Sequence, residues 1–466
     1  MNRREFIGGL AATVVARGLA DGARAVDAPR IKVGVLSDIH ISNYSKPGDR
    51  GHFGSWAFKK ALEYYRQNDV DAVMIVGDLT EYGTIEELKV VGRVWDEVFP
   101  GDCGRNGQEV AKIFTNGNHE RFRSGENRKP EDMVRDNEKR AMKEAFGIGD
   151  FGDLMVRDVK GYTFLVSEYG HEGCLVPYLK ANREKLRGSG RPFFYAQHVH
   201  LKGTNCPEVV DGGITAAALK EFPNAVAFSG HSHWSLTWED QIWQDEFTAI
   251  GTSCLQYMSG RFKGVGGLMY DNGVSPAAGQ GKHNLRLDTS GRQGMLMSVY
   301  DNRIVLERRE FITDESVGPD WVIPLDGSKP YSWERRQARR ATPEFEDGAV
   351  ATVRLARGRG RDGDEDQLQV VFPRPRPARG DDGRTLSYEI TAFHPEDGES
   401  KPLAKRVLYA QGYYLADRLL GRTGQCNFGA QDFAATGRVR FAVRACNSWG
   451  QAGQPIFGEY VYERVK

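Results

Sequence analysis

Between residues 31 and 325 of the 466-residue chain, short apolar runs alternate with segments of helical spacing. The runs "IKVGVL", "AVMIVG", "AKIFT", "TFLVS", "FFYA" and "AVAFS" have the near-continuous apolar character of buried strands, and polar residues follow each of them. Between the first two runs, "SWAFKKALEYYRQN" places its apolar residues at helical spacing. This alternation predicts an α/β fold, a layered β-sandwich core flanked by helices.

The pattern changes after residue 325. Residues 326–340 carry proline, turn residues and charge, which predicts a linker. Between residues 341 and 466, short alternating runs such as "LSYEITAFHP" and "GRVRFAVRAC" are separated by turns, as is typical of an all-β sandwich. The stretch "VRFAVRACNSWGQ" resembles the late strand and turn of a fibronectin-type-III module. We therefore expect a C-terminal β-sandwich domain.

Charge and cysteine usage exclude several classes of protein. Lys plus Arg and Asp plus Glu both number 63, so no net charge points to nucleic acid or to an anionic membrane as partner. The cysteines show no CxxC and no regular spacing, which argues against a disulfide framework or a zinc cage. We expect most of them to be small core residues, although one pair could bridge after export. The six are Cys103, Cys174, Cys206, Cys254, Cys426 and Cys446.

The first 25 residues resemble a twin-arginine export signal. Arg3 and Arg4 precede a short apolar stretch, and residues 23–25 have the small-x-small form of a cleavage site. Arg17, inside the apolar stretch, departs from the pattern. No later segment has the roughly 18 apolar residues that a spanning helix needs. We expect a soluble protein, periplasmic or secreted, whose partner in transit is the export machinery.

Histidines concentrate where predicted strands end. Six of the ten lie in "SDIH", "GNHE", "QHVH" and "GHSH", and "VGDLT" adds an aspartate after another strand. Open α/β sheets place their sites at the carboxyl ends of strands. Carboxylate, imidazole and amide groups together are what a site for two divalent or trivalent ions requires, and mixed N/O ligands accept Mn, Fe, Zn or Co. The sequence therefore predicts a dinuclear metal centre.

These blocks are similar to the signature of the calcineurin-like metallophosphoesterase superfamily, which runs D-x-H, G-D, G-N-H-D/E, H and G-H-x-H. The chain has every element in order across residues 31–240. The resemblance implies a metallophosphoesterase fold and a metal-bridging hydroxide that attacks phosphorus. It also implies the ligands: Asp38, His40 and His233 for one metal, Asn118, His198 and His231 for the other, and Asp78 as the bridge.

The resemblance also implies roles beside the metals. The histidine that matches His119 is not a ligand in the family, and we expect it to protonate the leaving alkoxide or to stabilise charge on the phosphoryl group. Glu120 is expected either to orient and polarise that imidazole or only to begin a helix. Substrate contacts or supporting contacts are expected from His200, Asn43 and Glu81, which lie in or after the ligand-bearing turns.

The implied activity is hydrolysis of a small-molecule phosphate mono- or diester outside the cytoplasm. A purple acid phosphatase is disfavoured because its tyrosine ligand would fall at Glu81, and Tyr82 is one residue too late. "GDLTEYGTIEEL" looks most like bacterial cyclic-nucleotide phosphodiesterases, so a phosphodiesterase of that type or a nucleotidase is the alternative. A non-catalytic exported binding module with a vestigial metal site is the alternative of another class. The presence of both Asp78 and His119 counts against it.

Overall fold

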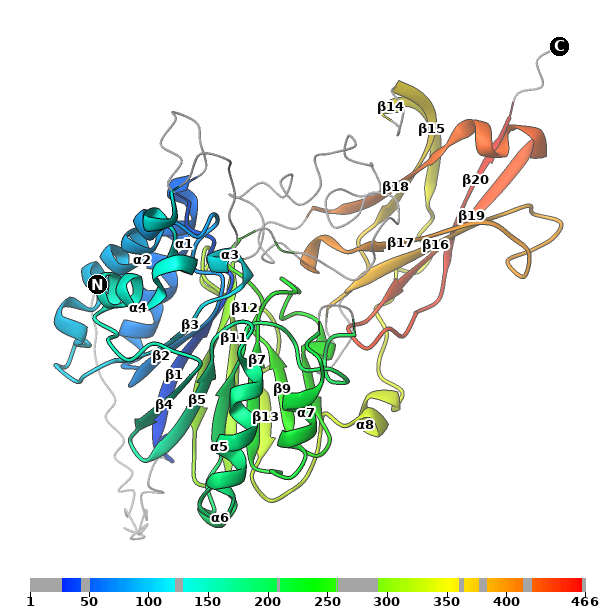
Figure 1. The fold of residues 1–466 in the computed structure, drawn as a ribbon. Coiled ribbons are helices and arrows are strands. Elements are labelled where there is room, and N and C mark those ends of the chain that lie inside the picture. The colour runs from blue at the N-terminus through cyan, green and yellow to red at the C-terminus, as the bar shows by residue number, and fades with distance from the viewer. Residues whose placement is uncertain are drawn as a thin grey trace, which may run out of the picture.

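The computed structural model describes residues 27–42, 51–121, 129–207, 210–256, 258, 292–359, 364–376, 384–413 and 421–462. Figure 1 shows a lobe of helices and sheets followed by a lobe built from strands. The expected export signal, residues 1–25, and Asn43 lie outside the described residues. Across the described ranges, no helix combines the length and the apolar character needed to cross a membrane.

The first sheet of the α/β lobe has the strand order β12-β11-β10-β1-β2-β3, with β13 paired to β11. Strands β1, β2 and β3 are parallel, and the later strands join them antiparallel through β10. Helix α2 (Ile85–Val98) begins at a capping box formed by Thr84 and Glu87, which satisfies the free backbone N–H groups of its first turn. The strands are β1 (Ile31–Leu36), β2 (Ala72–Val76), β3 (Ala111–Thr115), β10 (Gln293–Val299), β11 (Arg303–Glu310), β12 (Glu315–Ser316) and β13 (Trp321–Pro324).

Helices cover the outer side of the parallel strands of this sheet (Figure 1). They are α1 (Gly51–Gln67), α2 and α4 (Val134–Phe146). The apolar side chains of α2, among them Leu88, Val91 and Trp95, are buried in the same core as β1 and β2. Trp95 also packs edge-on against Phe114 of β3. The amphipathic face of α2 therefore attaches the helix layer to the sheet.

The second sheet has the order β4-β5-β6-β7-β9-β8. Its central strands β5, β6, β7 and β9 are parallel, with β4 and β8 antiparallel at the edges. The strands are β4 (Leu154–Val159), β5 (Tyr162–Ser167), β6 (Phe193–Ala196), β7 (Ala225–Ser229), β8 (Ile242–Gln244) and β9 (Thr248–Gly251). Its helices are α5 (Leu175–Ala181), α6 (Arg183–Gly188) and α7 (Ile214–Leu219).

Alternating side chains join the two sheets into one layered unit. On β5 and β6, Phe164 and Phe194 point into the core shared with the first sheet. Their neighbours Leu165 and Tyr195 pack on the opposite side, in a cluster with residues of α5, α6 and α7. Successive side chains of a strand face opposite ways, so a continuous apolar run buries both faces. The predicted fold, a layered core flanked by helices, is confirmed.

The C-terminal lobe consists of two antiparallel sheets, β14-β15-β18 and β17-β16-β19-β20. Side chains from both sheets, including Leu368, Val370, Ile390 and Val443, form one buried core between them. The predicted C-terminal β-sandwich is confirmed. The strands are β14 (Thr352–Arg359), β15 (Asp364–Pro373), β16 (Ser387–Phe393), β17 (Pro402–Tyr409), β18 (Thr423–Gly429), β19 (Arg438–Cys446) and β20 (Ile456–Val461).

The expected linker, residues 326–340, packs against the α/β lobe. It contains the short helix α8 (Trp333–Gln337). The side chain of Arg336 is buried and pairs with Asp240 at 2.5 Å. All six cysteines lie in described residues, and none of them forms a disulfide, so the bridge allowed by the sequence is not formed.

An aromatic junction connects the two lobes. Trp234 and Trp238 of the α/β lobe are buried in one cluster with Tyr409 and Tyr413 of the C-terminal lobe. The rings of Tyr409 and Tyr413 stack with their centroids 4.0 Å apart. The backbone N–H of Ser235 donates to the hydroxyl of Tyr413 at 3.1 Å. The C-terminal lobe thus holds the segment that directly follows His233.

Candidate metal centre

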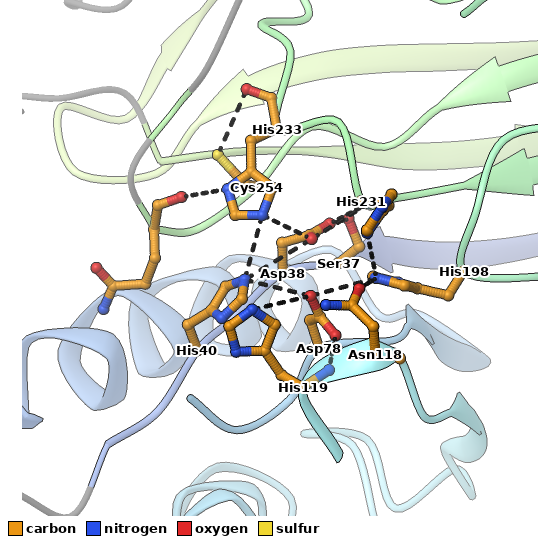
Figure 2. Close-up of polar contacts among 12 residues, drawn as sticks. Ser37, Asp38, His40, Asp78, Asn118, His119, His198, His231, His233 and Cys254 are labelled. Carbon is orange, nitrogen blue, oxygen red and sulfur yellow. Dashed lines mark hydrogen bonds and ion pairs between the residues drawn. The ribbon is translucent and has the colours of Figure 1, made fainter. Parts of the chain in front are cut away.

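The predicted ligands come from five strand ends of the two sheets and meet at one place (Figure 2). Asp38 and His40 follow β1, and Asp78 follows β2. Asn118 opens the short helix α3 (Asn118–Arg121) after β3. The second sheet contributes His198 after β6 and then His231 and His233 after β7. The seam between the two sheets is therefore where the ligands converge.

Two overlapping groups of donor atoms share Asp78. Asp38, His40, Asp78 and His233 form one group of mutually close ligand atoms, and Asp78, His198 and His231 form another. Five of these six residues are buried, and His231 is half-buried. The side-chain oxygen of Asn118 lies 3.0 Å from Nε2 of His198, at the second group. The structure thus brings together all seven predicted ligands.

Backbone carbonyls fix how two of the imidazoles are protonated. Nδ1 of His198 donates to the carbonyl of Val76 at 2.8 Å. Nδ1 of His233 donates to the carbonyl of Gln256 at 3.0 Å. With the proton on Nδ1, Nε2 of a neutral ring carries a lone pair, and Nε2 is the atom that faces the centre. Metal-ligating histidines typically donate their other ring N–H to an acceptor in this way, here from Nδ1 to a backbone carbonyl.

The lone pairs that face one another need a cation between them. Nε2 of His198 lies 3.2 Å from Oδ2 of Asp78, and Nε2 of His233 lies 2.9 Å from Oδ1 of Asp38. Nε2 of His233 is also 3.2 Å from Nε2 of His40. If the rings are neutral, these contacts place acceptor against acceptor in a buried site. The donor set therefore fits metal ions.

The pKa values of the clustered side chains also show that the site favours positive charge. Although burial opposes it, hydrogen bonds to Asp38 and Glu81 raise the pKa of His40 to about 10. The negative charge of Asp78 raises the pKa of His198 to about 9, although burial of the ring acts in the opposite direction. The pKa of Asp78 itself is held below its usual range by these histidines, against the effect of burial. Without metal, protons must supply the charge that divalent ions would otherwise supply.

The ligand-bearing turns are held in an uncommon backbone conformation. Ten non-glycine residues in the described ranges have positive φ, and five of them are predicted ligands. The left-handed region costs an L-residue about 1–2 kcal/mol, so surrounding contacts must hold these turns in place. The five ligands are Asp38 (φ 53°), His40 (φ 50°), Asp78 (φ 51°), His231 (φ 68°) and His233 (φ 56°).

Two glycines are required because a ligand side chain lies against them. A Cβ on Gly77, whose φ is 85°, would lie 2.3 Å from Nδ1 of His198. A Cβ on Gly117 would lie 2.2 Å from Oδ1 of Asp78. Neither contact is tolerable for a larger residue. The glycines of "GD" and "GNH" are thus part of the packing of the centre.

His119 lies beside the predicted ligands and forms a separate close group with His40 and Glu81, without belonging to either Asp78 group. Its Nδ1 donates to the carbonyl of Glu81 at 2.7 Å, and its Nε2 is 4.0 Å from Oδ2 of Asp78. The side chain is 20% exposed, whereas His40 is 1% exposed. Burial and the neighbouring His40 lower the pKa of His119. His119 therefore combines partial access to solvent with a ring nitrogen 4.0 Å from Oδ2 of Asp78.

Of the two roles expected for Glu120, the hydrogen bonds of its carboxylate do not include the imidazole of His119, and the residue lies in the short helix α3. Its fully buried carboxylate accepts from the backbone N–H and the hydroxyl of Thr80, both at 2.8 Å, and from the N–H of Gly117 at 2.6 Å. The side chain thus joins the turn after β2 to the turn after β3. The sequence could not indicate this, because the contact depends on the register of two parallel strands.

Glu81 and His200 support ligands. Oε2 of Glu81 is 3.0 Å from Nδ1 of His40, while its backbone carbonyl holds His119, so one residue orients both rings. His200 is fully buried, and its Nε2 lies 2.9 Å from Oγ of Ser232, between the two last ligands. Of the two roles expected for His200, the supporting one agrees with this burial. Ser235 and Tyr413 could not be predicted from the sequence, because a junction between lobes has no local signal.

Residues 31–235 match the calcineurin-like phosphoesterase family model. This chain therefore contains a calcineurin-like phosphoesterase domain, and the matched residues include β1 to β7 and the strand ends that carry the predicted ligands. No curated protein matches the chain.

The chain is also similar to several solved structures, at low sequence identity and with low TM-scores. A dimetal phosphatase from Danio rerio is 11% identical, with 64% of this chain and 100% of that chain covered and a TM-score of 0.40. A purple acid phosphatase from yellow lupin seeds is 12% identical, with 63% and 53% covered and a TM-score of 0.34. A conserved protein from Streptococcus pneumoniae, described as a predicted phosphoesterase, is 13% identical, with 63% of this chain and 97% of that chain covered and a TM-score of 0.28. Likeness at this level does not indicate a substrate.

The shared carboxylate leads to a prediction about metal content. Asp78→Asn should prevent loading of two ions, because the amide lacks the charge that both donor groups share. His119→Asn should keep both ions and serves as the matched control. Elemental analysis after equilibration with Mn²⁺ and gel filtration measures the stoichiometry. Two tightly held ions in Asp78→Asn would contradict the bridging assignment.

The aromatic junction predicts that the C-terminal lobe supports metal binding. Tyr413→Phe removes the acceptor of the Ser235 N–H, and an unsatisfied buried donor costs about 1–3 kcal/mol. Part of this cost should weaken Mn²⁺ binding, because Ser235 is two residues from His233. Tyr462→Phe is the control, since its hydroxyl donates to Ala430 inside the C-terminal lobe. Equal Mn²⁺ affinities of the two variants by calorimetry would refute the coupling.

Proposed function

We propose that this protein hydrolyses phosphate mono- or diesters at a dinuclear metal centre. The observation that carries the proposal is the pair of donor groups that share Asp78. Asp38, His40 and His233 would hold one ion, and Asn118, His198 and His231 the other. When bound, the ions supply Lewis-acid activation of water and neutralise charge on the phosphoryl oxygens. The family supports this reaction class, and the substrate within the class is the finer part of the proposal.

His119 is proposed to act on the leaving group. The carbonyl of Glu81 fixes the Nδ1 proton, so a second proton on the imidazolium lies on Nε2, which faces the centre. From there Nε2–H can donate to the oxygen of the leaving alkoxide. Because its ring is partly exposed beside buried ligands, substrate can reach it without displacing a ligand.

The complete donor set argues against a vestigial site. A binding module without catalysis has no need for two buried carboxylates at one point, because burying Asp38 and Asp78 costs free energy unless cations accompany them. Five ligands in left-handed conformation add to that cost. We therefore favour the enzyme over the exported binding module.

The proposal predicts turnover of model substrates. With Mn²⁺ added, the protein should release p-nitrophenol from p-nitrophenyl phosphate, from bis-p-nitrophenyl phosphate or from both, and their ratio decides between monoesterase and diesterase. His119→Asn should lower kcat by roughly 10²–10⁴-fold with both ions bound, as expected for loss of a general acid. No turnover of either substrate by metal-loaded protein would exclude the enzyme, and an unchanged kcat in His119→Asn would exclude the proposed acid.

We also propose that the protein acts in the periplasm or is secreted, which rests on the twin-arginine-like residues 1–25. Replacing Arg3 and Arg4 together by Lys should leave the full-length precursor in the cytoplasm, because the export machinery reads the arginine pair. Arg17→Lys, in the same segment, is the control and should still be exported. Immunoblots of cell fractions from the native host measure this. Equal export of the Arg3/Arg4 variant and the wild type would refute the proposal.

A further inference from the structure

A second set of metal-type ligands lies outside the dinuclear centre. Asp153, just before β4, is close to His171 and Cys174 at the 3-10 turn Glu172–Cys174. Oδ1 of Asp153 is 3.3 Å from Nδ1 of His171, and Sγ of Cys174 is 3.8 Å from Oδ2 of Asp153. Carboxylate, imidazole and thiol thus lie together, with Asp153 paired to His171 and accepting from the thiol of Cys174.

The separations of these atoms suit a zinc ion. With Zn–N and Zn–O distances of about 2.0–2.2 Å and a Zn–S distance of about 2.3 Å, neighbouring ligands of a tetrahedral site lie roughly 3.3–3.6 Å apart. The 3.3 Å between oxygen and nitrogen lies within that range, and the 3.8 Å between sulfur and oxygen is close to it. One ligand atom from each of the three residues lies within 4.8 Å of the others, so rotations of these side chains can bring the atoms to tetrahedral separations.

The backbone holds the three residues in place through successive hydrogen bonds. The N–H of Glu168 donates to the carbonyl of Asp153 at 3.1 Å, the N–H of His171 to that of Glu168 at 3.0 Å, and the N–H of Cys174 to that of His171 at 2.9 Å. Ligand positions fixed in this way lose little conformational entropy when an ion binds. The arrangement is therefore preorganised.

We propose that Asp153, His171 and Cys174 bind one zinc ion whose fourth position faces solvent. Thiolate and imidazole ligands favour zinc, whereas the dinuclear centre described above offers nitrogen and oxygen donors. Binding would convert the Cys174 thiol to a thiolate and release its proton to water. The side chains of Asp153 and His171 are 60% and 40% exposed, which leaves the open side accessible to water.

The proposed ion would restrain the segment between Asp153 and Cys174, which contacts residues of the dinuclear centre. The segment that links Asp153 to Cys174 includes Glu168, whose carboxylate pairs with Arg121 of α3. It also includes Tyr169, whose ring lies edge-on to His198 with centroids 6.0 Å apart. A zinc ion at the proposed site would therefore restrain residues that contact the ligand-bearing turns. This role does not depend on the substrate of the enzyme.

Cobalt titration of the metal-free full chain tests the proposal. Co²⁺ bound by a thiolate gives a near-ultraviolet charge-transfer band, which nitrogen and oxygen donors do not give. We expect that band, with three Co²⁺ bound per chain. Cys174→Ser should lose the band and bind two Co²⁺, and His171→Ala should weaken the binding that produces it at least tenfold. Cys254→Ser is the control, because Cys254 is the buried cysteine whose Sγ lies 3.9 Å from the carbonyl of His233.

The proposal is overturned if saturating Co²⁺ gives no charge-transfer band in the wild type. It is also overturned if the band persists in Cys174→Ser, or if it disappears only in Cys254→Ser. Circular dichroism of each variant, together with retention of the two Mn²⁺ of the dinuclear centre, shows that a lost band does not reflect unfolding.

Discussion

The centre depends on one constraint, namely that buried electron-pair donors which face one another must be separated by positive charge. Asp78 is where this constraint is concentrated. Its carboxylate belongs to both donor groups and accepts the backbone N–H of His119, and its backbone carbonyl accepts the N–H groups of Ile39 and His40. Surrounding contacts, among them those of the two close-packed glycines, hold the ligand-bearing turns in this arrangement. The fold thereby presents a prepared cation site at the seam of two sheets.

The C-terminal β-sandwich has a physical connection to that site. Through Tyr413 it supplies the hydrogen-bond acceptor for Ser235, and with Tyr409 it buries Trp234 and Trp238. The turn that carries His231 and His233 is therefore braced from outside the family domain. The same principle applies on the other side, where the segment from Asp153 to Cys174 contacts His198 through Tyr169. Rigid surroundings allow ligand atoms to remain close in spite of their mutual repulsion.

Local sequence patterns predicted the layered fold and the convergence of the strand-end residues, because strand ends are readable from apolar runs and parallel strands bring their carboxyl ends together. The assignment of seven of these residues as ligands came from the family resemblance and stays a prediction. The contacts between turns were not predictable in this way. Glu120 follows His119 in sequence, yet its carboxylate bonds to Thr80 on another turn. The role of Tyr413 required knowledge of how two lobes pack. Long-range register and packing between lobes leave no periodicity in a single sequence, so these supporting residues emerge only from the structure.

Anomalous diffraction from crystals of the full chain grown with Mn²⁺ tests the central claim most directly. The account predicts two separate peaks that flank Asp78, one among Asp38, His40 and His233 and the other among Asn118, His198 and His231. It further predicts that Nε2 of His119 remains free of both ions and directed at the space where substrate binds. A single peak, or an ion coordinated by His119 in place of Asp78, would contradict it.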